Sequence, residues 1–160
     1  MVFMNHNFQI RWATSPDPHS QNCIDELWTE IQKRYGFQAP NPMDFNDFLP
    51  PKGKFLLAES MDQKEVLGSV AYTKFDDTKC ELDAVYVFPQ FRKSKVATSL
   101  LVELQKNAIL DGYRSMILRA GSPQPEALAL YKNFGFQEIP SFGKWISDPT
   151  AICLEKKIVI

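Results

Sequence analysis

The first third of the chain changes from the short apolar run of a strand to the apolar spacing of a helix. Residues 8–13 are expected to form a short strand. Beyond it, apolar side chains recur at steps of three and four residues, which predicts an amphipathic helix that Ser15 caps and Gly36 ends. The apolar face of this helix consists of Ile24, Leu27, Trp28, Ile31 and Tyr35.

A polar segment, residues 38–54, separates this helix from three strand-like runs. The segment is rich in Pro, Asn and Asp and indicates a surface loop, within which Phe45 and Phe48 have the spacing of one helical turn. The three runs that follow are short, apolar or β-branched, and bounded by turn residues, as expected for strands. They cover residues 55–59, 66–72 and 81–87.

Two more amphipathic helices are expected in the second half of the chain. The first covers about residues 94–111 and is closed by Gly112. After a strand at residues 115–119, Ser122 is expected to cap a second helix that ends at Gly135. Two closing strands complete the pattern, at residues 136–139 and 152–158.

This order of elements favours a mixed sheet flanked by helices, in a single α/β domain that covers residues 1–160. Neither a doubly wound parallel sheet nor a four-helix bundle has this order. A chain of 160 residues buries roughly 68–70% of its unfolded surface. We therefore expect it to fold without a disulfide or a structural metal.

Composition and charge argue against two classes of partner. Hydrophobic residues make up 44% and charged residues 23% of the chain, and 18 basic against 19 acidic side chains give a net charge of −1. Such a chain has no overall field to attract nucleic acid or an anionic membrane. It also has no apolar run near the roughly 18 residues of a membrane span and no secretory signal pattern. A cytoplasmic protein is predicted.

The cysteine and histidine residues suggest neither a metal site nor a redox site. Cys23, Cys80 and Cys153 are far apart and form no C-x-x-C pair, so reduced thiols are expected and a cysteine nucleophile is not. His6 and His19 are isolated from other metal-ligating residues. No metal is therefore predicted.

The segment from residue 85 to residue 98 has the composition of an anion-binding site. A strand runs through a short loop into a helix, whose first N–H groups lack helical partners and lie at the positive end of its dipole. Arg92, Lys93 and Lys95 add positive charge that suits a pyrophosphate. On charge alone, a surface turn with solvated lysines is the more ordinary interpretation, because basic residues near helix starts are common.

Two motifs in this chain resemble those of the GNAT (GCN5-related N-acetyltransferase) superfamily. Residues 92–97 resemble its Arg/Gln-x-x-Gly-x-Gly/Ala loop, and residues 127–136, with their Leu-Tyr and Gly-Phe pairs, resemble its second conserved motif. The resemblance extends over about residues 54–158, and the C-terminal part of the chain is similar to that of small bacterial members of the family. It implies a central mixed sheet of about six or seven strands with about four helices, and transfer of an acetyl group from acetyl-CoA to an amine.

The resemblance also implies which residues bind the cofactor. The loop and the first helical turn would hold the CoA pyrophosphate, Val85 and Val87 would pair with pantetheine beside a splay in the sheet, and Gln124 stands where relatives carry an asparagine that contacts CoA. Lys93 and Lys95 depart from the family, which usually has glycines there. The implied pyrophosphate residues are Arg92, Lys93, Ser94, Lys95, Val96, Ala97 and Thr98.

The same resemblance implies the catalytic residues. Tyr131, in the Leu-Tyr position, would protonate the leaving thiolate, and it would also contact the cofactor. Glu81 would take the amine proton, directly or through water. Asp83, on the same strand face, is the alternative base or a partner for the substrate ammonium. A water chain in place of either carboxylate is a third possibility.

The acceptor amine is not defined by the sequence. In this family the loops at residues 38–51 and 140–150 would determine specificity. The acidic residues Asp44, Asp47 and Glu81 favour a cationic amine, although acidic loop residues are ordinarily just solvated. Three aromatic residues could line the acceptor pocket, although packing is the expected role of at least two: Tyr35, Phe142 and Trp145. A homodimer is possible. The alternative function is a non-catalytic module of the same fold that binds CoA or a protein partner.

Overall fold

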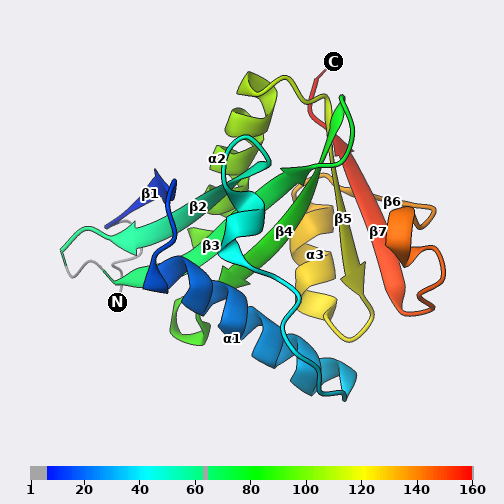
Figure 1. Ribbon diagram of the computed structural model, residues 1–160, viewed down its shortest axis with the longest axis horizontal. Coiled ribbons are helices and arrows are strands. Elements are labelled where there is room, and N and C mark those ends of the chain that lie inside the picture. Colours follow the sequence, from blue (N-terminus) through cyan, green and yellow to red (C-terminus); the bar gives the residue numbers. More distant parts are fainter. Residues whose placement is uncertain (1–6, 63–64, 160) are drawn as a thin grey trace.

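The computed structural model describes residues 7–62 and 65–159, which form a seven-stranded mixed sheet (Figure 1). The strand order is β1-β2-β3-β4-β5-β7-β6, and the pairs are antiparallel except for β4 with β5. The strands are β1 (Phe8–Trp12), β2 (Gly53–Ser60), β3 (Val66–Lys74), β4 (Lys79–Val87), β5 (Ser115–Gly121), β6 (Gln137–Ile139) and β7 (Ala151–Lys157).

Helices cover both faces of this sheet (Figure 1). One face carries α1 (Pro18–Tyr35) and the 3-10 helix η2 (Phe45–Phe48), with a core around Ile24 and Phe55. The other face carries α2 (Val96–Leu110) and α3 (Pro125–Asn133), with a core around Leu101 and Met116. The described residues thus contain three α-helices rather than about four, because the expected turn at residues 45–48 is a 3-10 helix.

The predicted order of elements is confirmed, but two helix caps are not. Asp17 rather than Ser15 caps α1, since its carboxylate accepts a hydrogen bond of 2.7 Å from the Ser20 amide. Gln124 rather than Ser122 occupies the cap position of α3 and makes no side-chain cap bond. At the other end of α1, Gly36 has the predicted left-handed conformation, with φ of 74°.

Two irregularities of β4 open the sheet at its centre. β4 pairs with β5 only from Lys79 to Glu81, so beyond Glu81 the two parallel strands separate. On its other edge, the pairing with β3 shifts between Ser69 and Ala71, so that two β4 residues oppose one, and Ala84 has a φ of 53°. The splay that the family resemblance implied is therefore present, and it places the middle of β4 in a cleft.

Candidate active site

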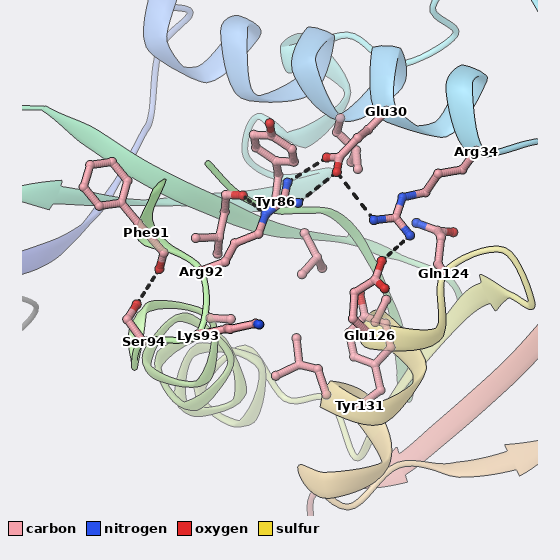
Figure 2. A pocket seen from close by; sticks show the side chains of 16 residues that line it. Glu30, Arg34, Tyr86, Phe91, Arg92, Lys93, Ser94, Gln124, Glu126 and Tyr131 are labelled. Atoms are coloured by element: carbon pink, nitrogen blue, oxygen red, sulfur yellow. Dashed lines mark hydrogen bonds and ion pairs between the residues drawn. The ribbon is translucent and has the colours of Figure 1, made fainter. Parts of the chain in front are cut away.

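Two adjoining cavities lie along this splay. The first, of about 280 Å³, is bounded by α1, the end of β4, the loop into α2 and the start of α3 (Figure 2). The second, of about 540 Å³, is bounded by α1, β4, β5 and the loop before β7. Both cavities fall close to the size range of small-molecule sites. They share four lining residues, namely Leu27, Val85, Gln124 and Tyr131.

The first cavity ends at the open N-terminus of α2. The first helical bond of α2 runs from the Ser99 amide to the Lys95 carbonyl, at 2.9 Å, and no side chain of the cap residue satisfies the earlier amides. Among the described residues, only the Val96 amide of this turn has a further partner, the Ser94 hydroxyl at 3.4 Å. The amides of the first turn are therefore available to an anion, and Ala97 of this turn lines the cavity.

The two lysines that replace family glycines differ in conformation. Lys93 has a φ of 58°, in the left-handed region, and its side chain extends into the first cavity (Figure 2). Lys95 has a φ of −93°, a conformation open to any residue, and its side chain lies outside the cavity. Strain is therefore confined to Lys93, while its ammonium is placed to meet a phosphate.

Replacing Lys93 by glycine should stabilise the fold. A left-handed non-glycine residue costs about 1–2 kcal/mol, and part of this gain is offset by the larger chain entropy of unfolded glycine. We expect Lys93→Gly to raise the free energy of unfolding by about 0.5–1 kcal/mol, measured by urea titration. Lys95→Gly is the matched control and should give no gain, because its φ is already negative; equal gains in both variants would contradict this account.

Arg92 is held by protein groups rather than left free for a ligand. Its guanidinium forms two bonds to the Glu30 carboxylate, of 2.9 and 2.7 Å, and its Nε donates to the Val87 carbonyl at 2.7 Å (Figure 2). The Glu30 hydrogen bonds raise the pKa of Arg92 further. Arg92 lines the first cavity, yet its clearest role is to tie the loop to α1 and to the end of β4.

The remaining residues expected to bind the cofactor divide between cavity and surroundings. Val85, Val87, Lys93, Ser94, Ala97 and Gln124 line the first cavity, whereas Lys95, Val96 and Thr98 do not. Val96 is instead part of the apolar core, and Lys95 and Thr98 are exposed. Gln124 lies between both cavities and accepts a hydrogen bond of 2.9 Å from the Tyr35 hydroxyl.

Tyr131 stands at the junction of the two cavities. Its ring packs against Phe136 with centroids 5.8 Å apart, and its hydroxyl has no hydrogen-bond partner among the described residues. Burial, and then the negative charge of Asp83, raise the pKa of Tyr131 above its ordinary value. The hydroxyl therefore stays protonated at physiological pH and can donate to an atom placed between the cavities.

The structure separates the two carboxylates proposed as the base. Asp83 lines the second cavity, and burial raises its pKa to about 6, although the Ala84 amide, which donates to it at 2.9 Å, acts in the opposite direction. Glu81 lines neither cavity and accepts a hydrogen bond of 3.4 Å from the Trp145 indole. Asp83 is thus the carboxylate that shares a cavity with Tyr131.

Comparison with known proteins bears directly on this arrangement. A family model described as "Acetyltransferase (GNAT) family" matches residues 9–136. This range includes the residues of α1, β4, α2 and α3 that line the two cavities. This chain belongs to the GNAT acetyltransferase family. The GNAT assignment agrees with the two motifs and accounts for the splayed sheet.

Individual proteins match most of the chain, in sequence or in fold. A protein of Azospirillum brasilense named "IAA acetyltransferase" is 25% identical over 138 residues, 84% of this chain and 88% of that protein. A structure from Klebsiella pneumoniae, assigned to the acyl-CoA N-acyltransferases, has a TM-score of 0.83 at 24% identity and covers 94% of this chain and 97% of that one. A GNAT acetyltransferase from Elizabethkingia anophelis with acetyl-CoA bound has a TM-score of 0.65 at 18% identity, covering 94% and 98%.

Two residues of this GNAT site were not identified from the sequence. Glu30 holds Arg92 and also lies 3.7 Å from Arg34, one turn along α1. Arg119, near the end of β5, donates to the Tyr35 hydroxyl at 2.8 Å and to Asp148 at 3.0 Å. The available signal for Arg119 was a charged residue near the end of an otherwise apolar strand. Glu30 had no such signal, because it lies 62 residues from its partner Arg92.

The residues suggested for the acceptor side are only partly in place. Tyr35 and Trp145 line the second cavity, whereas Phe142 packs against Phe75 with centroids 5.3 Å apart. Asp44 and Asp47 do not line it, because their carboxylates cap η2 through amides of that same segment. The acidic loop residues therefore give no support for a cationic acceptor.

The thiols and the metal-ligating residues show no sign of further chemistry. All three cysteines are free and buried, and burial raises the pKa of Cys23 and of Cys80 to about 12. Across residues 7–62 and 65–159, no three His, Cys, Asp or Glu side chains come together as a metal site would require; His19 is exposed, and His6 lies outside the described residues. No described helix is long and apolar enough to cross a membrane.

Proposed function

We propose that this GNAT protein is an N-acetyltransferase that moves the acetyl group of acetyl-CoA to a primary amine by direct attack in a ternary complex. The observation that carries the proposal is the position of Tyr131 between the two cavities, with Asp83 in one and the open α2 N-terminus at the end of the other. A donor and an acceptor bound in these cavities would meet at the Tyr131 hydroxyl.

The first cavity suits an acyl-CoA. Free amides of α2 and the Lys93 ammonium would meet the pyrophosphate. The edge of β4 that β5 leaves unpaired would meet the amide groups of pantetheine at Val85 and at the Val87 amide, since the Val87 carbonyl already accepts from Arg92. The Elizabethkingia anophelis protein of the same fold was crystallised with acetyl-CoA, which supports this choice of donor.

The second cavity suits the acceptor amine. Asp83 would bind the ammonium and take its proton, directly or through water, which leaves a neutral nucleophile. Nitrogen then forms a bond to the acetyl carbon as the carbon–sulfur bond breaks. Tyr131 donates its proton to the departing thiolate and recovers one from the attacking nitrogen, which loses its second proton as the amide forms. The products are an amide and the CoA thiol, and the first proton passes from Asp83 to solvent.

Acetyl-CoA binding is the first test of this proposal. We expect calorimetric titration at moderate salt to give micromolar affinity, about −8 kcal/mol. Ala97→Asp places a carboxylate where the pyrophosphate would lie and should weaken binding at least tenfold. The helix itself should tolerate this change, since an acidic residue favours a helix N-terminus.

The matched control for Ala97→Asp is Val102→Asp, an equal change of charge at an exposed α2 position outside both cavities. It should bind acetyl-CoA as the unmodified protein does, and desulfo-CoA serves as the ligand control. If the unmodified protein binds no acetyl-CoA up to millimolar concentration, the enzyme proposal fails and the protein-binding alternative takes its place.

A further inference from the structure

We infer that the acceptor is a small amine with one positive charge and a flat aryl group, held by aromatic walls in the second cavity. This inference rests on the proposed function and names the substrate class for the same site. It depends on three features of the cavity: what its walls present, how its charges are paired, and how large it is.

The walls of the second cavity present aromatic surface whose polar atoms are already bonded to protein. The Trp28 indole donates to the Ala39 carbonyl at 2.9 Å, and the Trp145 indole donates to Glu81. The Tyr35 hydroxyl accepts from Arg119 and donates to Gln124. Phe37 lies beside Trp28 at a centroid distance of 5.5 Å. The ring edges, and the ring surface that Arg119 and Lys144 do not cover, are apolar and favour an aromatic body.

Arg119 fixes two of these rings in place. Its guanidinium carbon lies 5.1 Å from the centroid of Tyr35 and 5.2 Å from that of Trp145. At the same time it bonds Asp148 at 3.0 Å and the Thr150 hydroxyl at 2.9 Å, which ties the loop before β7 to β5. The aromatic walls are therefore preorganised, so little ordering is required when a ligand enters.

The charges of the cavity leave one place for an ammonium. Four charged residues line it, two acidic and two basic, for a net charge of zero. Arg119 and Asp148 form an ion pair, and Lys144 is exposed above the Trp145 ring at 4.7 Å. Asp83 is the one lining carboxylate without an ion-pair partner in the described part of the chain. A second ammonium, as in a polyamine, would meet Lys144 or Arg119 instead of a carboxylate.

The position and size of the cavity complete the argument. Asp83 and Tyr131 line the cavity together, so an amine bound there would lie beside the proposed acid. A cavity of about 540 Å³ is of the size that encloses a small molecule.

A panel of amines tests this assignment by the release of CoA thiol from acetyl-CoA. We expect kcat/KM for 2-phenylethylamine and tryptamine to exceed that for butylamine and for spermidine by at least tenfold. Trp145→Ala should lower kcat/KM for the aryl amines at least tenfold and for butylamine less than threefold. Phe142→Ala removes an aromatic ring from the same loop but outside the cavity, and it should keep the aryl preference.

The outcomes separate this inference from the proposed function. Preference for spermidine, for butylamine or for a lysine peptide would overturn the aryl assignment and leave the acetyltransferase proposal intact. If no amine is acetylated, binding of 2-phenylethylamine in the presence of CoA is measured by the quenching of tryptophan emission. Binding that Trp145→Ala weakens at least tenfold would support the aryl-binding cavity and refute the acetyltransferase proposal. Absence of both turnover and such binding overturns both.

Discussion

Tyr131→Phe is expected to lower kcat about a hundredfold while leaving the affinity for acetyl-CoA unchanged within a factor of two. The substitution removes one oxygen atom from the junction of the two cavities and keeps the ring that packs on Phe136. A positioned general acid typically contributes 10²–10⁴-fold to a rate. Turnover is measured by thiol release, and affinity by calorimetry.

The pH dependence of the unmodified protein gives a second test of the acid role of Tyr131. Because burial and Asp83 raise the pKa of Tyr131, the hydroxyl stays protonated through the range in which the enzyme is assayed. The unmodified protein should therefore show no loss of rate between pH 8 and pH 9.5 from this group. Tyr113→Phe, outside both cavities, is the control; unchanged turnover in Tyr131→Phe would remove the acid role.

The sequence predicted the framework of the site because its elements have strong local patterns. The period of the apolar positions defined α1, α2 and α3, and short runs bounded by turn residues defined the strands. The position of Tyr131 came from resemblance to a GNAT motif rather than from its pattern, since a tyrosine on the apolar face of a helix is ordinarily a core residue. The structure places it at the core edge, 8% exposed, where both roles are compatible.

Contacts between segments far apart in the chain could not be predicted from the sequence. The role of Arg92 depends on Glu30, which lies 62 residues away on α1, and basic charge in a loop gave no sign that a carboxylate already held it. The strained φ fell on Lys93 and not on Lys95, a difference that follows from how the loop meets α2. Neither fact has a local signature in composition or periodicity.

The choice between Glu81 and Asp83 shows the same limit. The alternation of β4 places both carboxylates on the same face of the strand, so this pattern alone does not distinguish them. The separation of β4 from β5 begins just after Glu81, and Trp145, from a loop 64 residues away, donates to that carboxylate. Asp83, beside the bulge at Ala84, is left facing the cavity.

Asp83→Asn is therefore expected to lower kcat/KM for the amine about a hundredfold at pH 8, and Glu81→Gln less than threefold. The unmodified enzyme should show a break in log(kcat/KM) near pH 6, because the carboxylate of Asp83 is protonated below that pH and can no longer accept a proton. The break should be absent in Asp83→Asn and retained in Glu81→Gln. Equal losses in both variants, or a break that survives in Asp83→Asn, would assign the base elsewhere.

Stability separates a lost base from a damaged fold. The pKa of Asp83 is about 6 in the folded protein against an ordinary value of 3.8, so the folded state binds the proton more tightly and stability falls as pH rises through this window. Above pH 6 the ionised carboxylate opposes folding, and asparagine removes that charge while its side-chain oxygen can still accept from the Ala84 amide. Asp83→Asn should then unfold at an equal or higher temperature than the unmodified protein at pH 8, and lose that advantage near pH 4. If removal of this carboxylate stabilises the fold, the charge does not serve stability, and a role in the chemistry accounts for its presence.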